Sequence, residues 1–147
     1  GSEAAPAQQS NAASIEALSL VELDHWSGYA VSSSYGVGNS AVVSNVGADT
    51  AMYVDQVNIG NVSSGAGLVG QSWVGGTGTA NAVAIGNASS AFLCNLCGDA
   101  GVYGSSSQVN SGSVTAYSYV NTPVAGGIVR SATAIGNSAT YASGDGH

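Results

Sequence analysis

The chain has 147 residues and a mass of 14.2 kDa, which fits one domain with its own core. Charged residues make up only 6% of it and 22 residues are glycine, so small polar residues must form much of the surface, as in extracellular structural proteins. Arg130 is the single cationic side chain, against eight carboxylates, which excludes nucleic-acid binding and argues against recruitment to anionic lipid. No apolar run reaches the roughly 18 residues that cross a bilayer, so we expect no transmembrane segment.

The first 34 residues do not share the repeat that characterises the rest of the chain. Gly1–Ser2 resemble a cloning remnant, and the small polar stretch "EAAPAQQSN" that follows resembles the start of a mature exported protein. We expect a short helix capped by Ser10 or Asn11, then a strand in which apolar and acidic residues alternate from Val21 to Asp24. Because a solenoid needs a distinct end piece over its open core, we expect residues 1–34 to be an N-terminal tail and cap.

From residue 35 onward the chain repeats itself. "VAIGNASSA" (83–91) and "TAIGNSATY" (133–141) are nearly the same phrase, and five glycines fall in one column, spaced 22, 26, 26 and 24 residues apart. This period is too long for a heptad and too short for a propeller blade, and it fits one coil of a solenoid. The column and the asparagines that follow its glycines are Gly38, Asn39, Gly60, Asn61, Gly86, Asn87, Gly112, Gly136 and Asn137.

The residues between these glycines favour strands. In "AMYVDQVNI" (51–59), apolar residues such as Tyr53 and Val57 have one parity and Gln56 and Asn58 have the other, which is the alternation of a half-buried strand. Gly, Ser, Thr, Asn and Val dominate this part of the chain, so helix is disfavoured. We therefore predict an all-β fold, a β-solenoid or β-helix of about five 22–26-residue repeats, with Ala, Val and Ile inside.

The Gly-Asn step marks a corner of each coil. Both residues tolerate positive φ, and stacked Asn side chains can form a hydrogen-bonded ladder between coils that are stable only when stacked. The last repeat ends at His147, soon after Gly136, so we expect a piece of a longer repeat protein whose open edge invites self-association. The expected repeats are residues 35–56, 57–82, 83–108, 109–132 and, incomplete, 133–147.

Cys94 and Cys97 are the two cysteines of the chain. Their CxxC spacing is that of a redox motif, or of half a zinc site, but "AFLCNLCGDAG" does not precede a helix in a βαβ unit. We therefore expect a disulfide that pins the turn of the third repeat, as export would permit. His25 lies beside Asp24, but a lone histidine in a cap is expected to be structural, so we expect no catalytic residues, metal or cofactor.

Aromatic side chains are the candidates for ligand or partner binding. Exposed rings on an acidic, hydroxyl-rich surface stack on sugars or anchor a protein interface. The alternative is that half of them pack beneath loops. The rings concerned are Trp26, Tyr29, Trp73, Tyr103, Tyr117 and Tyr119.

The "AIGN" phrases, of which "SATAIGNSATYAS" (131–143) is the clearest, resemble the repeats of alphaproteobacterial surface proteins, specifically the holdfast anchor family HfaD, from about Tyr35 onward. They are also similar to the "AIG" head repeats of trimeric autotransporter adhesins and, in repeat length, to curlin. The HfaD resemblance implies a secreted, outer-membrane-associated protein of the bacterial cell surface. It would help fix the adhesive holdfast polysaccharide to the cell, together with partner anchor proteins.

We therefore expect a non-catalytic adhesion or anchoring module whose partners are other surface anchor proteins, extracellular polysaccharide or both. The alternative is a structural fibre subunit, amyloid-like or otherwise polymerising, that associates through the open edges of its coils.

Overall fold

The computed structural model describes residues 7–46, 50–95, 101–122 and 127–145. Over these residues the chain is built of parallel strands, and no described segment is a helix with the length and hydropathy needed to cross a membrane. The strands are β1 (Ala7–Asn11), β2 (Ile15–Val46), β3 (Thr50–Asn58), β4 (Val62–Asn95), β5 (Val102–Asn110), β6 (Val114–Asn121) and β7 (Gly127–Asp145).

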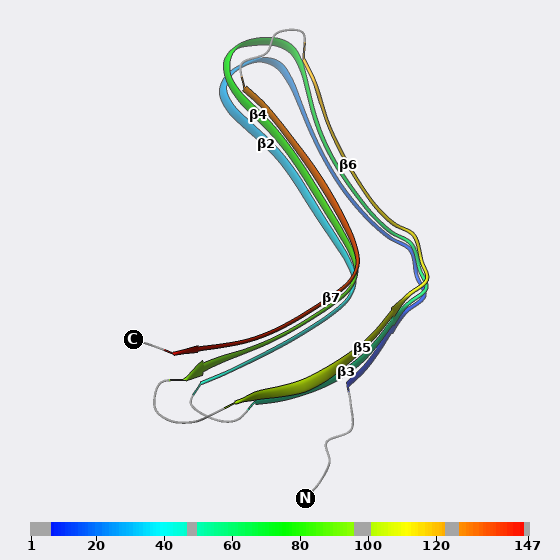
Figure 1. Cartoon of the computed structure of the whole chain (residues 1–147). Helices are drawn as coiled ribbons and strands as arrows, with labels where there is room; N and C mark the ends of the chain where they lie inside the picture. The colour runs from blue at the N-terminus through cyan, green and yellow to red at the C-terminus, as the bar shows by residue number, and fades with distance from the viewer. Residues whose placement is uncertain (1–6, 47–49, 96–100, 123–126, 146–147) are drawn as a thin grey trace, which may run out of the picture.

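The strands form three coils that follow one another along the same path (Figure 1). β1 and β2 make the first coil, β3 and β4 the second, and β5, β6 and β7 the third. One sheet has the order β1-β3-β5, and the other has β2-β4-β6 with β7 also paired to β4. All of these pairings are parallel, so the predicted all-β solenoid is confirmed.

The unit that stacks is about twice as long as the expected repeat. Asn39 pairs with Asn87, 48 residues later, and Asn87 with Asn137, 50 residues later. Each coil therefore has two corners, and the single glycine column splits into two. The prediction of five short coils is corrected to three long ones, because the local sequence repeats every half coil while the backbone pairing repeats every full coil. One column holds Gly38, Gly86 and Gly136, and the other holds Gly60 and Gly112.

The expected N-terminal cap is also wrong for the described residues. Ser10 and Asn11, where a helix start was expected, lie in β1, which pairs with β3. β2 crosses the expected boundary after residue 34 without a break and pairs with β4. The segment with Ser10 and Asn11 is a strand because its backbone groups pair with those of β3, which a helix could not do. The alternation expected from Val21 to Asp24 is confirmed, with the apolar residues half-buried and the acidic ones exposed.

Each coil is bent into an L (Figure 1). In the long arm of the first coil, residues 15–24 face residues 29–37, and Ser32 Oγ donates a hydrogen bond to the Ser19 carbonyl oxygen at 2.9 Å. In the short arm, β1 faces residues 39–46, and Gln9 Nε2 donates to the Ser40 carbonyl oxygen at 2.9 Å. The same two arms recur in the other coils, so two double layers meet at the bend.

The bend requires glycine because the coils approach closely there, and not because of positive φ. Among the described residues, only Gly28 and Gly76 have left-handed φ, of 90° and 105°, and neither belongs to the predicted column. A Cβ on Gly38 would lie 2.5 Å from the Gly86 carbonyl oxygen and 2.7 Å from Asn58 Oδ1. The expectation of left-handed corners in the glycine column is thus corrected.

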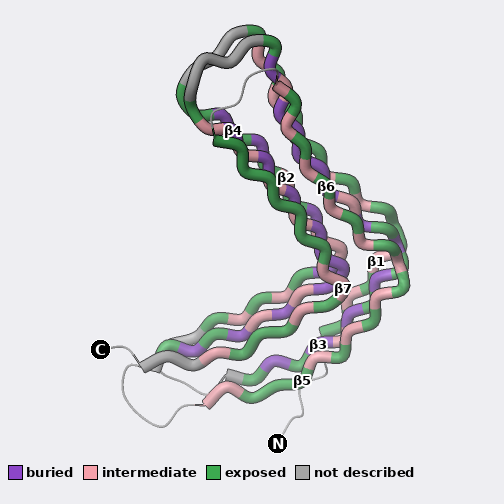
Figure 2. The backbone as a smooth tube through the Cα atoms, turned by 45° about the horizontal axis from the view of Figure 1, so that its top comes forward, coloured by how far each residue is buried: buried purple, intermediate pink, exposed green. Residues whose placement is uncertain are grey.

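The interior is thin and its residues are small. In the long arm Ala66, Ala80 and Ala82 are at most 1% exposed, which lets the two layers approach closely. In the short arm Met52 and Val54 pack with Ala91. Nearly all buried residues belong to the second coil, which is covered on both sides (Figure 2).

The strand at residues 51–59 buries the face opposite to the one expected. Tyr53 and Val57 are exposed, whereas Gln56 and Asn58 are fully buried. The prediction was wrong because a buried amide is costly only when it lacks hydrogen-bond partners, and here both amides have them.

Candidate functional site

Stacked asparagines form a ladder at the bend of the L. Asn39 Nδ2 donates to Asn87 Oδ1 at 2.8 Å, and Asn87 Nδ2 donates to Asn137 Oδ1 at 2.7 Å. The ladder that the Gly-Asn motif predicts is therefore present for these three residues. Asn61 is the exception, because it is exposed and its Oδ1 accepts a hydrogen bond from the Ser113 amide at 3.0 Å.

Two more amide ladders were missed in the sequence. Their neighbouring side chains are joined by N–H to O hydrogen bonds of 2.6–2.8 Å. The recurrence of Gln-x-Asn just before the first corner of each coil is the sequence signal for both rows, and it becomes visible only when the chain is aligned by full coils. Asn11, Asn58 and Asn110 form one ladder, and Gln9, Gln56 and Gln108 form the other.

The middle amide of each ladder uses both of its N–H groups. Besides its ladder bond, Asn58 Nδ2 donates to the Gly60 carbonyl oxygen at 2.8 Å, which closes the corner. Gln56 Nε2 donates to the Ala88 carbonyl oxygen at 2.8 Å, across the short arm. Both amides join neighbouring coils, and Gln56 also joins the two layers of the short arm, so they fix the bend.

The outer coils leave ladder groups without a partner among the described residues. A ladder in which every amide donates to the next necessarily ends in one unpaired acceptor and one unpaired donor. At the first coil these groups are Asn11 Oδ1, Asn39 Oδ1 and one N–H of Gln9. At the third coil they are one N–H each of Asn110 and Asn137, and Gln108 Oε1.

Of the six aromatic candidates, the structure brings two together. Tyr117 and Tyr119 lie on the same outer face of β6, opposite Gly65 and Gly67 of β4. Tyr29 is exposed in β2, near the tip of the long arm, and Tyr103 is exposed in β5, in the short arm. Trp26 and Trp73 are paired through their backbones, and their side chains lie outside the described part of the structure.

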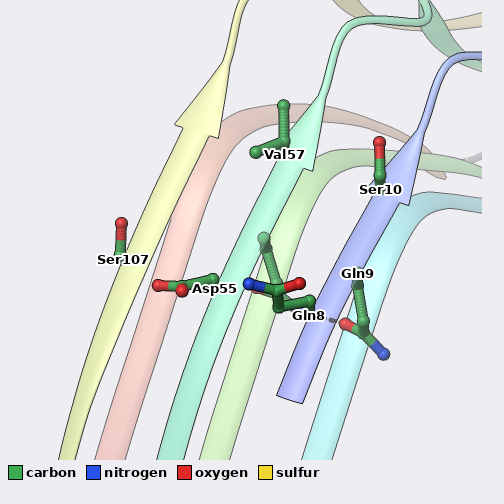
Figure 3. A pocket seen from close by; sticks show the side chains of 7 residues that line it. Gln8, Gln9, Ser10, Asp55, Val57 and Ser107 are labelled. Atoms are coloured by element: carbon green, nitrogen blue, oxygen red, sulfur yellow. Dashed lines mark hydrogen bonds between the residues drawn. The ribbon is translucent and has the colours of Figure 1, made fainter. Parts of the chain in front are cut away.

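A shallow pocket lies on the short arm, beside the Gln ladder (Figure 3). Asp55 stands between Gln8 and Ser107, its partners in the neighbouring strands. Its carboxylate is the one charged group of the lining, together with amides and hydroxyls. The pocket therefore offers hydrogen bonding to a polar ligand.

The predicted disulfide falls partly outside the described residues. Cys94 is exposed near the end of β4. Cys97 lies outside the described ranges, so the Cys94–Cys97 disulfide stays a prediction.

The comparisons with known proteins give one match. Neither the curated proteins nor the solved structures include one that matches the chain. A family model matches residues 1–61 and is described as HfaD, holdfast attachment protein D. The resemblance seen in the sequence lies in the repetitive region from residue 35 onward. The family match overlaps that region at residues 35–61 only. The predicted resemblance to the HfaD family is thereby confirmed over residues 1–61, which hold β1, β2, β3 and the corner that follows.

Proposed function

We propose that the chain is a non-catalytic module of the bacterial cell surface that anchors the adhesive holdfast polysaccharide to the cell. The observation that carries this proposal is the match of residues 1–61 to the holdfast attachment family. The described residues of this match, 7–46 and 50–61, belong to the folded solenoid, since they hold β1 and β2 of the first coil and β3 of the second. Export, association with the outer membrane and contact with other surface anchor proteins are parts of the same proposal.

The fold suits a protein that carries load. Consecutive coils are joined by parallel backbone pairing along β2 and β4 and by three amide ladders. A force along the stack would act on all of these hydrogen bonds at once, so no single bond would have to bear it. The buried amides of the middle coil, Gln56, Asn58 and Asn87, are all engaged in hydrogen bonds. The buried hydroxyls of the same coil, Ser64 and Ser89, are also hydrogen-bonded. This supports a structural role.

Deleting the gene tests the proposal. Cells without it are expected to make adhesive and shed it, and the unmodified gene is expected to restore retention. Complementation with Gly136→Ala, which the fold should tolerate, is expected to restore retention, whereas Gly86→Ala, which should disrupt the bend, is expected to fail. Normal retention of adhesive in the deletion strain would refute anchoring.

A second candidate is a structural fibre subunit. It is favoured by one specific observation, namely that the unpaired ladder groups of the first coil are the complements of those of the third coil. Electron microscopy of the purified protein separates the two candidates when it is combined with the deletion. Ordered fibres would favour the subunit, and shedding without fibres would favour the anchor.

A further inference from the structure

An apolar block lies on the outer face of the long arm, over residues 15–24, 62–71 and 114–121. Leu18 and Leu20 of the first coil are 61% and 54% exposed, and Tyr117 and Tyr119 of the third coil are 43% and 40% exposed. Contiguous exposed apolar side chains with a polar rim mark an interaction surface. We call this block the Leu-Gly-Tyr face. Its two rows, from the first coil to the third, are Leu18, Gly65 and Tyr117, and Leu20, Gly67 and Tyr119.

Two glycines in the middle of β4 shape this face. A Cβ on Gly65 would collide with Cζ and Oη of Tyr117, and a Cβ on Gly67 would collide with the same atoms of Tyr119. Each ring therefore lies over the backbone of the second coil, with one side on glycine and the other side free. Glycine weakens a strand interior, and an aromatic ring from the neighbouring strand compensates for the missing side chain.

The rim of the face is acidic and rich in hydrogen-bonding groups. Glu16, Glu22 and Asp24 are exposed along the first coil, and Thr115 and Asn121 are exposed along the third. Arg130, the one cation of the chain, is in β7 and pairs with Ala80, in the opposite layer of the long arm. The charge of this face therefore repels acidic polymers and also repels the same face of a second copy.

We propose that the Leu-Gly-Tyr face binds a polysaccharide that lacks acidic sugars. Tyr117 and Tyr119 are two residues apart on one strand, about 6.6 Å, so two rigid rings are offered side by side to successive sugar rings. The carboxylates and hydroxyls of the rim accept and donate hydrogen bonds to sugar hydroxyls. The face lies on the side of the stack and not at either of its ends. It therefore stays accessible when further coils or copies cover the open edges of the first and third coils. This inference rests on the proposed anchoring function and names the surface that would hold the polysaccharide.

Oligosaccharide binding to the purified chain tests the inference. The probes are hexamers of β-1,4-linked glucose, of N-acetylglucosamine and of glucosamine, with a polyguluronate hexamer as the acidic comparison. At least one non-acidic hexamer is expected to bind, and polyguluronate is not. The double variant Tyr117→Ser with Tyr119→Ser is expected to weaken binding by about tenfold or more. Tyr103→Ser, which removes an exposed ring from the short arm, is the matched control and is expected to bind normally.

Nuclear magnetic resonance of the unmodified chain keeps the test valid if the double variant does not fold. The ring protons of Tyr117 and Tyr119 are expected to shift on titration with the hexamer that binds, while those of Tyr103 stay in place. Binding that survives the double variant, tighter binding of polyguluronate, or no binding of any non-acidic hexamer would each overturn the inference. If the variant loses sugar binding but its cells retain adhesive, the face binds sugar without holding the adhesive, and the inference is overturned. The proposed anchoring function fails separately, if the deletion strain retains its adhesive.

Discussion

Asn39 donates a hydrogen bond from Nδ2 to Oδ1 of Asn87, 48 residues further along the chain, at 2.8 Å. Asn87 is fully buried and donates one N–H to Oδ1 of Asn137. Its second N–H donates to the Val109 carbonyl oxygen at 2.9 Å, across the short arm. One side chain therefore holds together three coils and two layers. These amide hydrogen bonds therefore act at the bend of the L, together with the apolar packing of each arm.

Asn87→Ala is expected to destabilise the chain strongly. The substitution leaves the Asn39 N–H and the Val109 carbonyl oxygen without their partner in the interior, so we expect a loss of about 2–4 kcal/mol in the free energy of unfolding. Urea denaturation followed by circular dichroism measures it. Asn137→Ala at the exposed end of the same ladder is the control, and a loss below about 1 kcal/mol is expected because water replaces the missing group. Equal losses of stability for the two variants would contradict the conclusion that the buried middle of the ladder stabilises the fold.

Gly86→Ala and Gly136→Ala should differ sharply although they occupy the same column. A Cβ on Gly86 would lie 2.5 Å from Asn110 Oδ1 and would collide with the Gly136 carbonyl oxygen, whereas a Cβ on Gly136 has Asn110 Nδ2 at 3.7 Å as its nearest neighbour. We expect Gly86→Ala to lower the free energy of unfolding by about 2 kcal/mol or more. Gly136→Ala is expected to be neutral or stabilising by up to about 1 kcal/mol, because it reduces the freedom of the unfolded chain. Thermal unfolding of both variants, measured side by side, decides this, and similar melting temperatures would count against the close approach at the bend.

The fold class could be predicted because alternation and the glycine column are local properties. The length of the coil could not be predicted, because the two corners of a coil have similar sequences, as the residues around Gly60 and Gly86 show. Only the pairing of the strands reveals that Gly86 stacks on Gly38 and not on Gly60. The first coil escaped recognition for a related reason, since its first corner has Ala13 in place of the glycine.

The candidate site was predicted in part. Asn39, Asn87 and Asn137 could be assigned to a ladder from a motif of adjacent residues. The burial of Gln56 could not be predicted. Hydrophobic alternation places amides in the solvent, because it takes no account of hydrogen-bond partners from coils about 50 residues away. Tyr117 and Tyr119 were two of six aromatic candidates in the sequence. The glycines beneath them belong to another coil, so the face that they share appears only once the register is known.

Cys94 and Cys97 are expected to form a disulfide in the exported protein. The spacing allows it and an oxidising compartment favours it. Because the loop that it closes is very short, Cys94→Ser is expected to change stability only modestly. A thiol count on the denatured, unreduced protein checks the bond. No free thiol is expected before reduction and two are expected after it, so two free thiols at the outset would refute the disulfide.

End-to-end association of the chain is expected to follow from the polarity of the ladders. If the third coil of one copy meets the first coil of the next, the free N–H of Asn137 faces the free Oδ1 of Asn39, and the other two ladders match in the same way. Such a head-to-tail contact does not close on itself, so it generates open assemblies. Sedimentation velocity over a range of concentrations is expected to show growing species.

Asn137→Asp is designed to break this contact while keeping the hydrogen bond from Asn87. Within the coil it removes only the 3.3 Å bond from Asn137 Nδ2 to the Gln108 carbonyl oxygen, at the exposed end of the ladder. The new carboxylate still accepts the hydrogen bond from Asn87 Nδ2, but it presents an acceptor to the acceptor Asn39 Oδ1 of the next copy. Association is therefore expected to weaken by about tenfold or more. Asn61→Asp makes the same change in residue and charge on the exposed surface of the middle coil, so it is expected to associate like the unmodified chain. An unmodified chain that stays monomeric at high concentration, or equal association of the two variants, would show that the ladder ends do not drive assembly.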